Sequence, residues 1–143
     1  MSETKIIILD FDGTLADTAS VIVQTTQATI RELGLPSRTD AECAAMIGLR
    51  LIEIPPVLFP DCEVDGGLYA ETYRRLFKTF NTDGAVTLYP NVMETLHELK
   101  GRGYTLTIAS SRSRASLEDY VRSLGLEDVI TYLLGAADVT EGK

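Results

Sequence analysis

Apolar and polar positions follow two spacings along this chain, and each spacing predicts one kind of element. Residues 5–9 form a short apolar run rich in isoleucine, which is typical of a parallel strand buried on both faces. Residues 104–109 and 129–133 predict two more such strands. Apolar residues at helical spacing predict helices over 92–99 and 117–124. This alternation predicts an α/β fold built on a parallel sheet.

A long segment with helical patterning separates the first strand from the others. Small or apolar residues keep helical spacing from 15 to 33, and Thr39 with Glu42 forms a capping-box pattern that begins another helix. Residues 69–80 carry an aromatic stripe opposite a charged face, which is typical of a helix packed on a core. We therefore expect residues 16–85 to form an all-helical insertion.

Two carboxylates follow the first strand. In extended chain, side chains at positions i and i+2 point the same way, so Asp10 and Asp12 are expected to converge at the carboxyl end of the strand. Such a pair repels itself unless a proton or cation lies between the two groups, and hard oxygen ligands suit Mg²⁺. The alternative is a solvated turn at Gly13.

A hydroxyl-rich segment follows the strand at 104–109. Ser110, Ser111 and Ser113 lie where a strand ends and a helix begins, and the free N–H groups of a helix start attract anions. The alternative is an ordinary serine cap.

Composition argues against two classes of binding partner and indicates a cellular location. The chain has 143 residues, 45% of them hydrophobic, and a formal net charge of −8, which disfavours nucleic acid and anionic membrane surfaces as partners. No apolar stretch is long enough to cross a bilayer. Cys43 and Cys62 match no zinc-site spacing and are expected to be free thiols, so a cytoplasmic location is expected.

The segment from Asp10 to Leu15, with Asp17 two residues on, resembles the first motif of the haloacid dehalogenase (HAD) superfamily. The resemblance is to the branch of phosphoglycolate phosphatases and β-phosphoglucomutases, whose members carry a helical cap. It implies that Asp10 is the nucleophile and becomes an aspartyl-phosphate. It also implies that Asp12 is the general acid and base, that Asp10 and Asp12 hold Mg²⁺, and that the backbone carbonyl of Asp12 faces the metal.

The same resemblance assigns four more residues. Ser110 matches the second-motif hydroxyl that holds the phosphoryl group, with the N–H of Ser111 beside it, and Lys143 matches the third-motif lysine that neutralises charge. Arg50 lies in a segment similar to the cap loop that contacts the leaving group. An ordinary surface arginine is the alternative for Arg50.

The resemblance also implies a domain organisation. Residues 1–15 and 86–143 are expected to form a Rossmann-like core, and residues 16–85 the all-helical cap. Members of this family continue past the lysine into another strand and a fourth, acidic motif, so the core is expected to be incomplete at its C-terminal side. The missing neighbour leaves an apolar edge on the first strand, which predicts self-association through that edge.

The leading hypothesis is a Mg²⁺-dependent phosphatase, a hydrolase acting on a small phosphorylated metabolite. A sugar phosphomutase of the same superfamily would use the same two aspartates and remains an alternative. A second alternative is a catalytically incomplete fragment that binds only phosphate or a partner. A phospho-accepting receiver domain conflicts with the helical insertion after Leu15.

Overall fold

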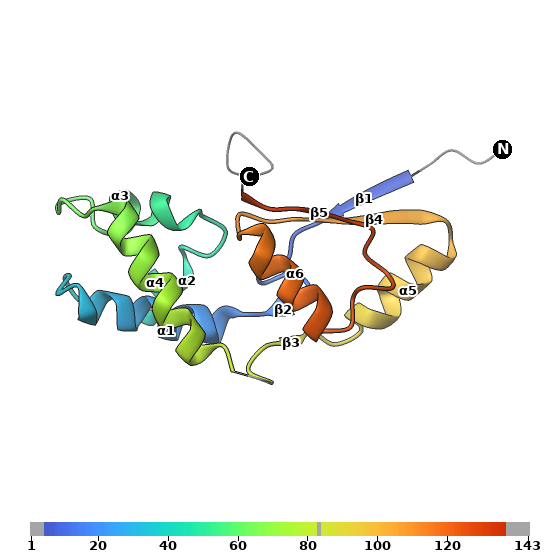
Figure 1. Cartoon of the computed structure of the whole chain (residues 1–143), viewed down its shortest axis with the longest axis horizontal. Helices are drawn as coiled ribbons and strands as arrows, with labels where there is room; N and C mark the ends of the chain where they lie inside the picture. Colours follow the sequence, from blue (N-terminus) through green and yellow to red (C-terminus); the bar gives the residue numbers. More distant parts are fainter. Residues whose placement is uncertain (1–4, 83, 137–143) are drawn as a thin grey trace. The chain divides into compact units, whose positions relative to one another are not determined.

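The computed structural model describes residues 5–82 and 84–136, which divide into two compact units (Figure 1). The core unit comprises the described residues up to Asp17 and from Thr87 onward. The helical unit comprises Thr18–Val86. Within the part of the chain that is described, no helix has both the length and the apolar character needed to cross a membrane.

A parallel sheet of three strands forms the centre of the core unit. The strands are β1 (Lys5–Leu9), β4 (Tyr104–Ala109) and β5 (Tyr132–Leu134). Their order is β1-β4-β5, with Leu9 opposite Ile108 and Ala109 opposite Leu134. The α/β fold and the parallel pairing expected from the sequence are confirmed.

Two helices cover one face of this sheet. Helix α5 (Val92–Gly101) precedes β4 at the end of the long connection from β1, which also contains the helical unit, and α6 (Arg114–Ser123) connects β4 to β5. Both connections step across the sheet in the same direction, and right-handed crossovers in one direction place their helices on the same side. Figure 1 shows α5 and α6 on one side of the sheet. Ile108 of β4 pairs with Leu9, which lies beside Val92 and Leu96 of α5, and both Ile108 and Leu106 are fully buried.

Strand β1 is less buried than its apolar sequence predicts. It lies at the edge of the described sheet, and the exposed fractions of Ile6 and Ile8 are 59% and 63%. Tyr132 on β5, paired with Thr107 and therefore directed to the same face as Ile8, is 60% exposed. The prediction of full burial for this strand was wrong, because α5 and α6 both lie on the opposite face.

The segment expected to be all-helical, residues 16–85, begins with a strand. Residues 16–17 form strand β2 (Ala16–Asp17), which pairs antiparallel with β3 (Thr87–Leu88). The N–H of Tyr89 also donates to the carbonyl of Leu15 at 3.0 Å. The chain thus leaves and re-enters the core unit through a short two-stranded ladder.

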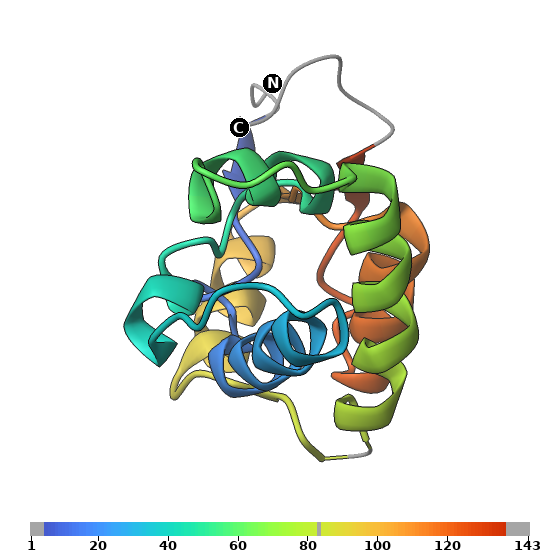
Figure 2. The same ribbon diagram turned by 90° about the vertical axis from the view of Figure 1, so that its left-hand side faces the viewer.

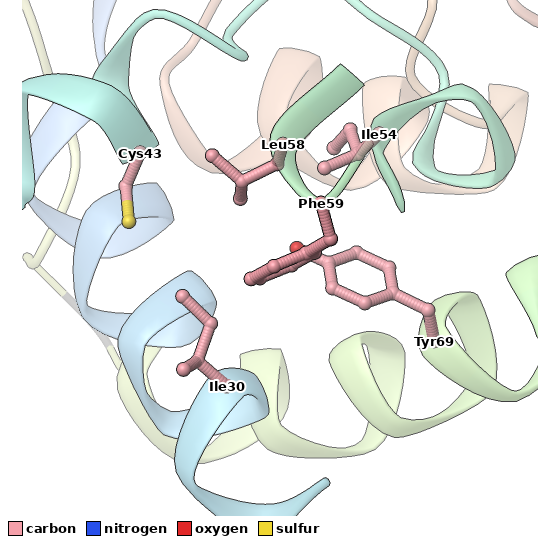
Figure 3. Packing of buried hydrophobic residues seen from close by; sticks show 6 residues of the cluster. All are labelled: Ile30, Cys43, Ile54, Leu58, Phe59 and Tyr69. Atoms are coloured by element: carbon pink, nitrogen blue, oxygen red, sulfur yellow. The ribbon is translucent and has the colours of Figure 1, made fainter. Parts of the chain in front are cut away.

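The helical unit packs around α1 and α4, which contact each other and are seen from the side of this unit in Figure 2. Its elements are α1 (Ala19–Glu32), α2 (Asp40–Ala44), the 3₁₀ helix η1 (Leu51–Glu53), α3 (Ile54–Leu58) and α4 (Gly66–Phe80). Six buried side chains that meet between these elements are shown in Figure 3: Ile30, Cys43, Ile54, Leu58, Phe59 and Tyr69. The apolar faces of short helices are therefore buried against one another.

Local sequence signals set the ends of these helices. The capping box of Thr39 and Glu42 is present, with the Glu42 N–H on the Thr39 hydroxyl at 3.1 Å. Asp65 caps α4, since its carboxylate accepts the N–H groups of Gly67 and Leu68 at 2.9 and 3.1 Å. That cap explains why α4 begins at a glycine.

Candidate active site

The carboxyl ends of β1 and β4 meet at one edge of the sheet. Leu9 and Ile108 are partners in the parallel ladder, so the loops that begin at Asp10 and Ser110 leave the sheet side by side. Asp10 is exposed, Asp12 is half-buried, and Ser110 is only 4% exposed. Ligand sites of open α/β sheets form outside such strand ends.

A tight turn shapes the first of these loops. The carbonyl of Phe11 accepts the N–H groups of Thr14, Leu15 and Ala16 at 3.2, 3.0 and 3.1 Å. Gly13 adopts a φ of +76°, a conformation that a glycine takes without strain. The fully buried Phe11 ring lies 5.4 Å from the ring of Tyr120 on α6, so an apolar anchor separates the two carboxylates in sequence.

The second loop presents the Ser110 hydroxyl. The N–H of Ser110 donates to the carbonyl of Leu134 at 2.9 Å, and the Ser110 Oγ accepts the N–H of Arg112 at 3.1 Å. A hydroxyl carries one donor and two acceptor positions, so this arrangement leaves its hydrogen available to donate to another oxygen. Ser111 follows, half-buried.

The end of β5 supports the second loop from the other side. The N–H of Ala136 donates to the carbonyl of Arg112 at 2.9 Å. A Cβ at position 135 would lie 2.7 Å from the backbone N of Arg114 and 3.2 Å from the carbonyl oxygen of Arg112. Only glycine lets the β5 end approach the loop this closely.

An ion pair joins the two loops. Arg112 donates from Nη2 to Asp12 Oδ1 at 2.6 Å and from Nε to Asp12 Oδ2 at 3.3 Å. Both side chains are largely buried, with exposed fractions of 12% and 10%. Arg112 was not among the predicted site residues, although one signal pointed to it: Asp12 and Arg112 carry opposite charges and follow the paired residues Leu9 and Ile108 by three and four positions.

Tyr120 lies beneath this ion pair. The Arg112 guanidinium carbon is 5.0 Å from the centre of the Tyr120 ring, within the range of a cation–π contact. Burial raises the pKa of Tyr120 from 10.0 to about 12, with Arg112 opposing the rise and Asp12 adding to it. The phenol is therefore neutral at physiological pH.

The groups at the strand end offer oxygen atoms, which are the ligands that a hard cation prefers. Asp10 brings an exposed carboxylate, and Thr14 Oγ1 lies 3.4 Å from its Oδ2, too long for a strong hydrogen bond. The Asp12 carboxylate is engaged by Arg112, so the Asp12 donor that fits a metal is its backbone carbonyl. Among residues 5–82 and 84–136, no three acidic, histidine or cysteine side chains gather as a metal cluster.

The described residues of the core unit do not include two of the residues singled out in the sequence. Arg50 belongs to the helical unit, where it precedes η1 and its Nε lies 3.8 Å from Glu53 Oε1. Lys143 lies outside the described residues. The structure thus brings together Asp10, Asp12, Ser110 and Ser111 at one sheet edge.

Known proteins similar to this chain include named phosphatases. A Dickeya dadantii protein named "Probable phosphatase IndB" is 34% identical over 96% of this chain and 61% of its own length. A phosphoglycolate phosphatase of Nitrosococcus oceani is 28% identical over 100% and 66%. The chain thus spans about two thirds or less of the length of these relatives.

A solved structure supports the same placement. The crystal structure of a haloacid dehalogenase-like hydrolase from Bacteroides fragilis superposes with a TM-score of 0.82 at 26% identity, over 99% of this chain and 67% of that one. The family model described as "Haloacid dehalogenase-like hydrolase" matches residues 7–143. The chain therefore belongs to the haloacid dehalogenase-like hydrolase family.

Proposed function

We propose that this chain carries the catalytic loops of a phosphatase that hydrolyses a small phosphorylated metabolite through an aspartyl-phosphate on Asp10. The observation that supports it most directly is the parallel pairing of Leu9 with Ile108, which puts both loops at one edge. The names of the two relatives above, both phosphatases, agree with this proposal.

The first displacement uses the exposed carboxylate. An Asp10 oxygen attacks phosphorus, the bond from phosphorus to the leaving oxygen breaks, and Asp12, once released from Arg112 and protonated, gives its proton to that oxygen. The Ser110 hydroxyl, held by the Arg112 N–H, donates to a phosphoryl oxygen. The Ser111 N–H is the second donor in this proposal.

The second displacement regenerates the enzyme. Asp12 accepts a proton from a water molecule, the water oxygen attacks phosphorus, and the bond from phosphorus to Asp10 breaks, which releases inorganic phosphate. Charge on the phosphoryl oxygens must be balanced throughout. We assign part of this charge balance to Lys143, because Lys143 matches the third-motif lysine of the family pattern.

Mg²⁺ completes the proposed site. The Asp10 carboxylate and the Asp12 backbone carbonyl would hold it, and when bound it would supply positive charge that offsets the negative charge of the reacting groups. The helical unit is proposed to act as the cap, with Arg50 contacting the leaving group. The two free thiols agree with a proposed cytoplasmic location.

Substitution of the nucleophile tests the proposal. Asp10→Asn should lower turnover of phosphoglycolate with MgCl₂ by about a thousandfold or more, since it removes the group that forms the covalent intermediate. The matched control is Asp119→Asn, which alters an exposed acid on α6. Borohydride reduction should trap the phosphorylated residue at position 10 in the wild type alone. Hydrolysis that survives in Asp10→Asn would remove the assignment.

A second candidate is a piece that binds phosphate without turning it over. The short span relative to the relatives favours it, because the chain covers 61% and 66% of their lengths. This candidate predicts binding of inorganic phosphate with no turnover, and turnover once the chain is extended by the remaining third of a relative. Equal turnover by the short and extended chains would reject it. Measuring free phosphate against isomerised sugar phosphate separates the phosphatase from a phosphomutase.

We also propose that the exposed isoleucines of β1 support self-association. An edge strand offers unpaired N–H and C=O groups to another chain, and Ile6 and Ile8 add apolar surface beside them. Sedimentation velocity should show a species larger than the monomer as concentration rises. A monomer at every concentration would contradict this proposal.

A further inference from the structure

Strand β1 carries apolar side chains on both of its faces at the edge of the described sheet. Ile6 and Ile8 are exposed on the open face. Ile7 and Leu9 alternate with them along the strand and therefore point to the other face, where Leu9 lies beside α5. A strand that adds to this edge must therefore be apolar on both faces in order to match it.

A groove lies beside β1 on the face covered by α5. Its lining includes Leu9 of β1 and three apolar residues of α5: Val92, Leu96 and Leu99. Among the described residues, none of β4 lines it, so the groove lies on the side of β1 that faces away from β4. Its volume of about 190 Å³ is below the range of about 300–1,000 Å³ that is typical of ligand pockets. The groove therefore suits the side chains of a neighbouring strand better than a metabolite.

The sequence of β1 itself matches this edge. Strand β1 (Lys5–Leu9) has four apolar residues in a row and one charged residue, Lys5, at its start. In the described sheet, β4 is already paired on both sides, and β5 has three residues. A second copy of β1 is thus the strand of this chain that is apolar on both faces and long enough to cover the edge.

From these features we propose that two copies of this chain associate through their β1 strands, which pair antiparallel about a two-fold axis perpendicular to the sheet. Such an axis keeps the covered faces of both sheets on the same side, so residues opposite one another share a face. With Ile7 opposite Ile7 of the second copy, all five residues of β1 have a partner. Ile6 then lies opposite Ile8 of the second copy.

This register also separates the charges of the two strands. Lys5 lies opposite Leu9 of the second copy, whereas in-register parallel pairing would place the two Lys5 residues side by side, and like charges directly opposite are destabilising. The proposal adds a partner strand and a register to the self-association proposed above. It does not depend on the proposed phosphatase function.

The proposed pair is closed. Each copy uses the same edge, so the interface is isologous and ends at a dimer. Pairing of β1 with β5 of another copy would be heterologous and would continue into longer assemblies. A contact made by one short strand from each copy is small, and small interfaces associate weakly. We therefore expect a concentration-dependent equilibrium between monomer and dimer.

Two matched substitutions separate edge pairing from stacking of the open faces. Ile8 and Tyr132 both lie in register with Thr107, and they are 63% and 60% exposed, but only Ile8 belongs to β1. In sedimentation velocity, Ile8→Lys should raise the dissociation constant of the dimer by about tenfold or more, since a charge on an edge strand opposes pairing. Tyr132→Lys makes the same change in net charge and should stay within about twofold of wild type.

Three results of this measurement would overturn the proposal. Equal weakening by Ile8→Lys and Tyr132→Lys would indicate that the open faces stack on each other. Species larger than the dimer would indicate a heterologous contact. A wild type that is monomeric at every concentration would remove the interface altogether.

Cysteine cross-linking tests the register at exposed positions, and it provides the test if Ile8→Lys does not fold. The Cα atoms of directly opposite residues lie about 4.5–5.5 Å apart, which a disulfide can span. A mixture of Ile6→Cys and Ile8→Cys chains should therefore cross-link when copper phenanthroline oxidises the two thiols. Each variant alone should cross-link far less, because its two cysteines would lie about 7–8 Å apart on the diagonal.

The wild type measures the background from its own thiols, Cys43 and Cys62. A mixture that cross-links no more than either single variant would overturn the proposed register, and mass spectrometry identifies the linked positions. A phosphatase assay of the wild type reports separately on the proposed function. An inactive wild type together with a cross-linked mixture would refute the proposed function alone, and an active wild type without the cross-link would refute this proposal alone.

Discussion

The two faces of the core sheet differ sharply although the same strands build both. On the face covered by α5 and α6, Leu106 and Ile108 are fully buried. On the opposite face, Ile6, Ile8 and Tyr132 remain 59%, 63% and 60% exposed. Apolar sequence alone therefore does not decide burial; the direction of the chain crossovers decides which face receives the helices.

This difference has a consequence for the site. The candidate site depends on the pairing of β1 with β4, and in the described residues the buried aliphatic side chains of β4, Leu106 and Ile108, lie on one face only. Burial of an aliphatic side chain contributes about 1.5–3 kcal/mol, so most of the packing energy of the sheet should come from the covered face. Variants on the two faces can test this expectation.

The largest effect is expected on the covered face. Ile108→Ala removes a side chain with no exposed surface and should lower the free energy of unfolding by about 2–5 kcal/mol, through lost burial and a residual cavity. Urea denaturation measures this change. A loss below about 1 kcal/mol would show that the covered face is not the better packed one.

An intermediate effect is expected at high pH from Tyr120, which lies under the same face. Its folded pKa is raised from 10.0 to about 12, so the unfolded chain loses this proton first, and stability falls as pH rises from 10 towards 12. At pH 11 this linkage is worth about 1 kcal/mol. The unfolding free energy of Tyr120→Phe should therefore fall less steeply with rising pH than that of the wild type. Some fall should remain, because Tyr69 also has a pKa of about 12. Parallel pH profiles for the two proteins would contradict the expectation.

The smallest stability effect is expected on the open face. Ile8→Thr keeps a β-branched side chain at a position that is already 63% exposed, so the free energy of unfolding should change by less than about 1 kcal/mol. The same change should shift sedimentation towards the monomer. If Ile8→Thr destabilises the protein as much as Ile108→Ala does, the two faces do not differ in the way described.

Local patterns predicted much of this fold. The strand expected at residues 104–109 is β4 (Tyr104–Ala109), and the capping box at Thr39 is present. The strand expected at 129–133 begins only at Tyr132. The reason is that Val129 and Ile130, though buried, donate their N–H groups to Leu126 in a turn.

The candidate site was predictable in part. The Asp10 and Ser110 loops follow strands whose ends an apolar pattern can locate, so their common edge could be expected. The bond between Asp12 and Arg112 joins residues 100 positions apart, and no local periodicity contains that information. It depends on the register of β1 and β4, which the tertiary structure sets.

Gly135 is a position at which substitution should disturb the structure. Even the methyl group of alanine would meet the Arg114 backbone at 2.7 Å, and the Arg112–Arg114 segment would have to yield. A substitution there would disturb the candidate site without altering any of its charged or hydroxyl side chains. Mutational scans should therefore find inactive variants at Gly135, which a survey restricted to charged and hydroxyl side chains would overlook.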